Sequence, residues 1–230
     1  MSTVLVIGDT HFPFQHKDMF EFLETVAEEY QPDEVVQVGD LIDIHSCSRH
    51  DADPDGSAPG DELELAITGC EELSRLFPEM KIVYGNHDLR FHKAAYRARV
   101  PAAMIKGLDE VIGVDGWEFA MDHIIDEVLY THGTAFGGET GHVKAVLRHM
   151  RSVVMGHTHT TFGVEYVANR DRLLFGVAAG CLVDHNSYSM AYAKEYPKKP
   201  LLGAVVVEDG ILAKPIPMVI DRSGSWIGRI

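Results

Sequence analysis

The sequence has few cysteines, and no two of them lie close together. Cys47, Cys70 and Cys181 are the three cysteines among 230 residues, and no C-x-x-C pair occurs. An odd and widely spaced set indicates neither a disulfide framework nor a thiolate zinc site. The disulfide-stapled and thiolate-zinc classes are therefore disfavoured.

Long apolar runs and basic residues are also scarce. No apolar run approaches the roughly 18 residues that span a bilayer, so we expect no membrane association. The opening MSTVLVIGDTH lacks a basic region and a small-residue cleavage site, so we expect no signal peptide and a cytoplasmic location. Lys and Arg number 20 against 35 Asp and Glu, a formal net charge of −15. An acidic protein repels polyanions unless positive charge is added locally.

The composition is otherwise that of a globular protein rich in histidine. Hydrophobic residues make up 46% of the chain, and the length suits a single domain over 1–230 with a C-terminal tail at 221–230. Trp226 in the tail is expected to pack on the core or on a partner subunit, so a homo-oligomer stays open. The 13 histidines are notable because histidine is the commonest metal ligand.

Hydrophobic periodicity predicts an alternation of strands and helices in the first half. Strands are expected at 4–7, 35–38 and 81–84, with helices at 19–30 and 63–77 between them, an order that favours a mostly parallel sheet. The second half is richer in strands, predicted at 117–120, 128–131, 152–155, 163–167, 173–177, 202–208 and 211–217, with a helix at 143–150. Asp209-Gly210 predicts a hairpin turn. The long loops 44–60 and 184–200 are expected to be functional.

Five of these apolar runs end in side chains that can bind metal. In chain order the runs lead to Asp9 and His11; Asp40 and Asp43; Asn86, His87 and Asp88; His132; and His157 and His159. Ligands of α/β sheets bind beyond the carboxyl ends of the strands, so the five sets are expected to converge. Glycine precedes the first ligand in four of them, which allows a sharp turn.

Seven of these residues are candidate metal ligands: Asp9, His11, Asp40, Asn86, His132, His157 and His159. They are too many for one tetrahedral site and enough for two ions if one carboxylate bridges. Oxygen and imidazole donors suit Mn, Fe, Zn or Ni. A metal pair roughly 3.5–4 Å apart stabilises the attacking and leaving oxygens of a phosphoryl displacement.

The remaining polar residues of these runs have expected roles beside the metals. His87 is predicted to donate a proton, with Asp43 or Asp88 orienting its imidazole. Arg90 and His92 follow the third run and are candidate contacts to a phosphate oxygen of the substrate. Taken singly, each residue has a simpler explanation, such as a turn for Asp40 or a core histidine for His132. All five sets occur together, each after its own strand, and this combination favours a metal site over five separate structural explanations.

The motifs themselves resemble a known family. Asp-Thr-His at 9–11, Gly-Asp-x-x-Asp at 39–43, Gly-Asn-His-Asp at 85–88, His132 and Gly-His-Thr-His at 156–159 are similar to the five blocks of the calcineurin-like metallophosphoesterases, in the family's order. The resemblance covers residues 4–160 directly. It implies an α/β fold, a four-layer α/β/β/α sandwich of two mixed sheets with the metals at the sheet edge.

The resemblance also implies a role for each residue. Asp9, His11, Asp40 and His159 would hold one metal, and Asp40, Asn86, His132 and His157 the other. Asp40 would bridge the two ions together with the hydroxide that attacks phosphorus, and His87 would assist the leaving oxygen. Manganese is the metal we expect first.

Differences between this sequence and the subgroups of the family narrow the range of expected substrates. Phosphoprotein phosphatases of this family carry Gly, Arg and Glu where Phe12, Ile44 and Asp88 stand here. The family's recombination nucleases usually carry an additional capping region, for which this chain has little room. The charge of −15 disfavours long DNA, and Arg97, Arg99 and Lys198-Lys199 are too few to neutralise it.

We therefore expect a two-metal phosphodiesterase acting on a small or nucleotide-like substrate. A compact DNA or RNA nuclease that grips a strand end, or a phosphomonoesterase, remains an alternative, so a nucleotide or short nucleic acid is a candidate partner. A metal-binding scaffold without turnover is the alternative from another class. Relatives of that kind lose the histidine of the third block, and the presence of His87 favours an enzyme.

Overall fold

Two mixed β-sheets form the centre of the protein. The computed structural model describes residues 2–48, 56–184, 186–187 and 197–230, so parts of the long loops at 44–60 and 184–200 lie outside the described residues. The first sheet has the strand order β11-β10-β1-β2-β3-β4. Its strands are β1 (Thr3–Ile7), β2 (Glu34–Gln37), β3 (Met80–Val83), β4 (Trp117–Ala120), β10 (Gly203–Glu208) and β11 (Leu212–Pro217). β1, β2 and β3 are parallel, as the sequence predicted. β4 extends the parallel set, and β10 and β11 add antiparallel strands.

The second sheet has the order β5-β6-β7-β9-β8. Its strands are β5 (Asp122–Ile125), β6 (Val128–Thr131), β7 (Val153–Met155), β8 (Phe162–Ala168) and β9 (Leu173–Ala179). β6, β7 and β9 run parallel, whereas β5 and β8 pair antiparallel at the two edges. The parallel strands of both sheets therefore have carboxyl ends that can serve one site.

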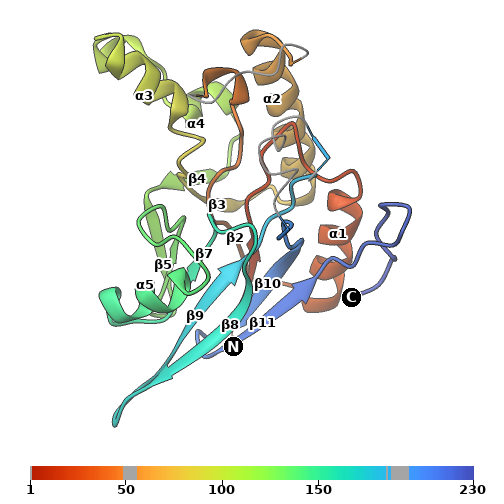
Figure 1. Ribbon diagram of the computed structural model, residues 1–230, viewed down its shortest axis with the longest axis vertical. Helices are drawn as coiled ribbons and strands as arrows, with labels where there is room; N and C mark the ends of the chain where they lie inside the picture. The colour runs from red at the N-terminus through yellow and green to blue at the C-terminus, as the bar shows by residue number, and fades with distance from the viewer. Residues whose placement is uncertain (1, 49–55, 185, 188–196) are drawn as a thin grey trace.

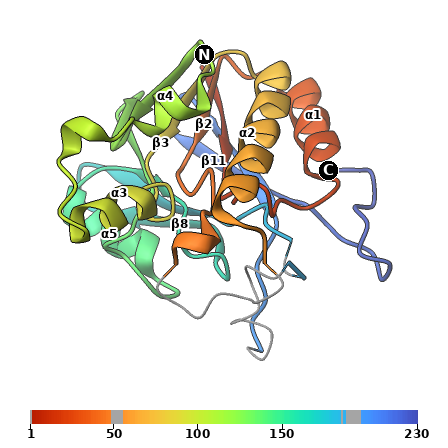
Figure 2. The same ribbon diagram turned by 90° about the horizontal axis from the view of Figure 1, so that it is seen from above.

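Helices lie on the outer faces of the two sheets, except for the helix Arg90–Arg97, which extends beyond the ends of the strands (Figures 1 and 2). They are α1 (Met19–Tyr30), α2 (Pro59–Leu76), α3 (Arg90–Arg97), α4 (Leu108–Ile112) and α5 (Gly141–His149), with short 3-10 turns η1 (His45–Cys47) and η2 (Ala102–Met104). Alternation along β1 sends Leu5 and Ile7 to the core beneath α1 and α2, and Val4 and Val6 to the core between the sheets. A third core joins the second sheet to α5. These layers confirm the α/β/β/α sandwich.

Most elements lie where the sequence placed them, and three were missed. α1, β4 and β6 match their predicted bounds, and α2 begins earlier than predicted because Pro59 occupies its first turn. The missed elements are β5, α3 and α4. β5 is a four-residue strand whose residues are partly exposed, and α3 buries no residue, so neither has the apolar pattern that predicts an element.

The C-terminal tail packs on its own chain. The Trp226 ring lies edge-on to Phe22 of α1, with centroids 5.6 Å apart. Its backbone N–H donates to Asp18 Oδ2 at 2.8 Å. Of the two expectations for the tail, the structure shows the intramolecular one. No helix of the described part of the chain is long and apolar enough to cross a membrane.

Candidate metal centre

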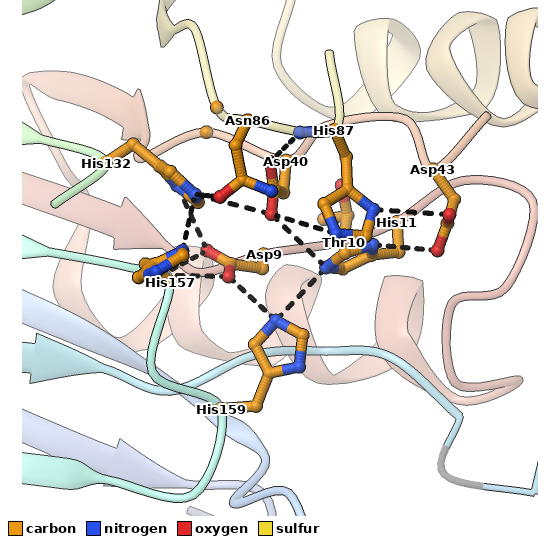
Figure 3. A network of polar contacts seen from close by, with 12 residues as sticks. Asp9, Thr10, His11, Asp40, Asp43, Asn86, His87, His132, His157 and His159 are labelled. Carbon is orange, nitrogen blue, oxygen red and sulfur yellow. Dashed lines mark hydrogen bonds and ion pairs between the residues drawn. The ribbon is translucent and has the colours of Figure 1, made fainter. Parts of the chain in front are cut away.

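The five predicted sets of polar residues converge beyond the ends of β1, β2, β3, β6 and β7 (Figure 3). The chain turns sharply there, because His11, Asp40 and His157 all have left-handed backbone angles, with φ of 52°, 51° and 68°. Such angles are costly for residues other than glycine and are characteristic of functional sites.

Asp9, His11, Asp40 and His159 form the first ligand group, with one donor atom of each within 4.8 Å of the others. Asp9 Oδ2 lies 2.9 Å from His159 Nε2. The Nε2 atoms of His11 and His159 face each other at 3.1 Å. Two imidazole nitrogens directed at one place are the arrangement expected of ligands to a shared cation.

Asp40, Asn86, His132 and His157 form the second ligand group. His132 Nε2 lies 3.3 Å from Asp40 Oδ2 and 3.2 Å from His157 Nδ1. The amide oxygen of Asn86 lies 3.2 Å from the same Nε2 atom. The donors are again carboxylate and amide oxygens with imidazole nitrogens, a set that fits a divalent cation.

Asp40 belongs to both groups. Its Oδ1 atom accepts the backbone N–H of His87 at 2.7 Å, which fixes the carboxylate. Its Oδ2 atom lies 3.7 Å from His11 Nε2 and 3.3 Å from His132 Nε2, so this one oxygen faces both groups. Asp40 could therefore bridge two cations.

Two of the imidazoles are oriented by hydrogen bonds at the far side of the ring. His11 Nδ1 lies 3.0 Å from Asp43 Oδ2, and His132 Nδ1 lies 3.0 Å from the carbonyl oxygen of Val38. Each Nδ1–H donates to its oxygen, which directs Nε2 at the ligand group. Partners of this kind fix the tautomer of metal-binding histidines.

The glycines before the ligands are required mainly by close packing. A Cβ on Gly85 would lie 2.1 Å from Asp40 Oδ1, and a Cβ on Gly156 would lie 2.1 Å from Asp9 Oδ1. Gly39, with φ of +95°, is the one of the four that needs the left-handed backbone. The sharp-turn explanation from the sequence thus holds for Gly39, and close approach explains Gly85 and Gly156.

The charges of the centre are strongly coupled. Burial alone would raise the pKa of Asp40, but the neighbouring His132 and His87 hold it well below its usual range. Burial and the nearby His87 lower the pKa of His11, and burial and His132 lower that of His157. Burial opposes the charge on His132, yet Asp40 raises its pKa to about 10. The ionised carboxylate therefore attracts positive charge to this place.

His87 lies beside the bridging carboxylate, with Nε2 3.8 Å from Asp40 Oδ2. Its Nδ1 lies 3.2 Å from Asp43 Oδ1, and Arg90 donates to its Nε2 at 2.9 Å. Burial would lower the pKa of His87, but Asp40 and Asp43 outweigh it and raise the pKa. Of the two residues predicted to orient His87, Asp43 is thus the one that contacts its ring.

Asp88, the other candidate for orienting His87, is occupied elsewhere. Its Oδ1 accepts the N–H of Ile42 at 3.0 Å, and its Oδ2 accepts the N–H of Gly85 at 2.7 Å. Burial, and then the charge of Asp40, raise its pKa to about 6. The carboxyl group ties the second block of the sequence to the third.

Arg90 and His92, the predicted substrate contacts, face different ways. Arg90 reaches the centre, where its guanidinium pairs with Asp43 Oδ1 at 2.6 Å. His92 follows two residues later, about 200° around α3, and its half-buried ring packs edge-on against Phe91 at 5.9 Å. The structure brings Arg90, and not His92, to the two ligand groups.

Two supports of the site were missed in the sequence. The backbone carbonyl of Val38 orients His132, and a backbone group leaves no mark in the sequence. Glu62 is buried and accepts the backbone N–H groups of His45 and Ser46 at 2.5 and 2.9 Å, which holds η1 beside the centre. Its signal was available, since Glu62 is the acidic residue on the face of α2 that also carries Ala66, Gly69, Cys70 and Leu73.

Comparison with known proteins places these features in a family. The model of the calcineurin-like phosphoesterase family matches residues 2–174. The Gene 54 protein of Mycobacterium phage D29 is 28% identical over 179 residues, which cover 68% of each chain. Among solved structures, Vps29 of Chaetomium thermophilum has a TM-score of 0.50 at 12% identity, over 98% of this chain and 94% of that one. A metallophosphoesterase from Sphaerobacter thermophilus has a TM-score of 0.47 at 16% identity, over 94% and 87%. The match to Vps29 shows the fold alone.

Proposed function

The chain belongs to the calcineurin-like phosphoesterase family, and from this premise we propose that it hydrolyses phosphodiester bonds with the help of two divalent cations. The observation that carries the proposal is the pair of ligand groups that share Asp40 and lie beside the His87 imidazole. Asp9, His11, Asp40 and His159 would hold one cation, and Asp40, Asn86, His132 and His157 the other. When bound, the two cations activate water and stabilise the charge on the attacking and leaving oxygens.

The residues of the chain perform the proton transfer and the positioning. Hydrolysis joins the oxygen of water to phosphorus and breaks one ester P–O bond. The acid is the imidazolium form of His87, in which Nδ1–H donates to Asp43 and the Arg90 guanidinium has turned away from Nε2. The leaving oxygen takes its proton from this Nε2–H. The guanidinium of Arg90, at the edge of the centre, supplies positive charge for a phosphate oxygen.

We prefer a diester to a monoester as the substrate because of three residues in and beside the sequence blocks. Phe12, Ile44 and Asp88 stand where the phosphoprotein phosphatases of the family carry Gly, Arg and Glu. In this proposal manganese is the metal to test first, with Fe, Zn and Ni as alternatives that the same donors accept. The free thiols of Cys47, Cys70 and Cys181 agree with a cytoplasmic enzyme.

The proposal is tested by a substrate screen with Mn²⁺. Bis-p-nitrophenyl phosphate is compared with p-nitrophenyl phosphate, cyclic nucleotides and short single-stranded DNA, and we expect a higher kcat/KM on diesters. Turnover of the monoester alone would show that the protein is a phosphomonoesterase and not a diesterase. Bound metal without turnover of any substrate would favour a metal-binding scaffold.

A further inference from the structure

Residues 89–108 of this acidic protein are rich in basic residues and contain no acidic residue. Residues 89–108 contain five of the 20 Lys and Arg residues and none of the 35 Asp and Glu residues. The formal charge of the segment is therefore +5, and the rest of the chain carries −20. We call residues 89–108 the basic arm. Local positive charge of this kind is what a polyanionic ligand needs on a negatively charged protein.

The basic arm begins at the metal centre. Arg90 opens α3, and its side chain, 19% exposed, contacts His87 and Asp43. From there α3 extends beyond the ends of the strands, at the upper left of Figure 1, and packs against η1. A ligand that follows the basic arm therefore leads into the proposed catalytic residues.

The basic residues of α3 share one face of the helix. Lys93 and Arg97 follow Arg90 by three and seven residues, so the three side chains lie within about 60° of one another and extend over about 10 Å. Lys93 and Arg97 are exposed, as are Arg99 and Lys106 beyond the helix. Among the described residues, none of these four has an acidic partner. Their charges are available to an external anion.

An exposed aromatic ring stands beside the basic face. Tyr96 is 83% exposed and follows Lys93 by three residues, which places it about 60° from Lys93 around α3. α3 buries no residue of its own. Solvent-exposed aromatic rings next to a row of cations are the two features with which proteins bind single-stranded nucleic acid, by stacking on bases and by neutralising phosphates.

We propose that the basic arm binds single-stranded nucleic acid and delivers a phosphodiester of that strand to the metal centre. This inference rests on the proposed function, because it names the substrate class of the same site. A single strand is preferred to a duplex, since one row of a few cations offers too little charge for a double helix. From the sequence, Arg97 and Arg99 were expected to be too few to offset the net charge of −15 and bind long DNA. The local charge of +5 on the basic arm changes this expectation for a single strand.

Binding is measured by the fluorescence anisotropy of a labelled thymidine oligonucleotide, about 20 nucleotides long, with the full-length chain in EDTA. The test variant replaces Lys93, Arg97 and Arg99 with Gln. The matched control replaces Arg170, Arg222 and Arg229 with Gln, which removes the same charge from exposed positions outside the basic arm. We expect the test variant to bind about tenfold more weakly and its log Kd against log salt slope to fall by about 2, with the control unchanged.

A second variant tests the stacking contact. Tyr96→Ala is expected to weaken binding of the oligonucleotide about fivefold or more, and Tyr96→Phe to restore it, because the ring and not the hydroxyl stacks. Tyr96 is exposed, so neither change is expected to unfold the protein. A uridine oligonucleotide in the same assay distinguishes RNA from DNA.

The outcomes separate this inference from the proposed function. Hydrolysis of bis-p-nitrophenyl phosphate with Mn²⁺ is expected to be equal in the wild type and in both charge variants. Equal loss of oligonucleotide binding in the test and control variants, or no binding by the wild type, would overturn the role of the basic arm while leaving the diesterase in place. Binding of anionic vesicles or of a partner protein in place of the oligonucleotide would also overturn it. Failure of bis-p-nitrophenyl phosphate hydrolysis alone would count against the proposed function.

Discussion

Asp40 is the residue that joins the two ligand groups, since its Oδ2 atom faces His11 on one side and His132 on the other. Asp40→Asn keeps the size of the side chain and removes its charge. Loss of an outer hydrogen-bond partner of a metal ligand lowers metal affinity by about 10- to 100-fold. We expect Asp40→Asn to lower the Mn²⁺ affinity of both positions by more than this. Calorimetric titration and metal analysis measure this. Asp109→Asn, at an exposed carboxylate, is the control and should bind normally; selective loss of one ion in Asp40→Asn would show that Asp40 does not bridge.

His87 contacts both Asp43 and Arg90 but belongs to neither proposed ligand set. His87→Ala is expected to retain both ions and to lower kcat by about 10²- to 10⁴-fold, because the leaving oxygen then departs without a proton donor. The loss should be largest for leaving groups of high pKa, so a series of substituted phenyl diesters is the informative assay. Full activity of His87→Ala on the poorest leaving group would remove its role as the acid.

At the scale of the elements, the turns after the strands determine how closely the blocks approach. A methyl group at Gly156 would meet Asp9 Oδ1, whereas a methyl group at Gly137 would meet no atom within 4 Å. Gly156→Ala is therefore expected to weaken Mn²⁺ binding about tenfold or more by displacing the Asp9 carboxylate, and Gly137→Ala to leave it unchanged. Neither glycine needs a left-handed backbone, so the pair isolates the contact. Equal metal binding by the two variants would contradict the close-packing explanation.

The elements also show what the sequence can predict. β1, β2 and β3 are followed, directly or after one residue, by Gly-Asp or Gly-Asn. A buried strand followed by such a pair predicts both the sheet and its ligands. β5 and α3 were missed because they bury little apolar surface and so leave no periodic signal. The backbone carbonyl of Val38 and the choice of Asp43 over Asp88 depend on distances between separate turns, which no local pattern contains.

At the scale of the whole molecule, we propose that residues 1–230 form a single domain that includes the C-terminal tail. Trp226 is buried against Phe22, so Trp226→Ala should lower the free energy of unfolding by about 3 kcal/mol. The corresponding fall in Tm is about 6–12 °C for a chain of this length. Ile230→Ala, at an exposed side chain, should leave Tm within error. Two separate thermal transitions in the wild type, or no effect of Trp226→Ala, would contradict a tail that belongs to the domain.

The central claim is that two cations at the ligand groups enable the chain to hydrolyse a phosphodiester. The most direct measurement is the turnover of bis-p-nitrophenyl phosphate during titration of Mn²⁺ into chelator-treated protein, with bound metal determined at each point. The account predicts binding of two ions per chain, with full turnover reached only when the second ion is bound. Two bound ions without turnover, or turnover that survives the chelator, would contradict it.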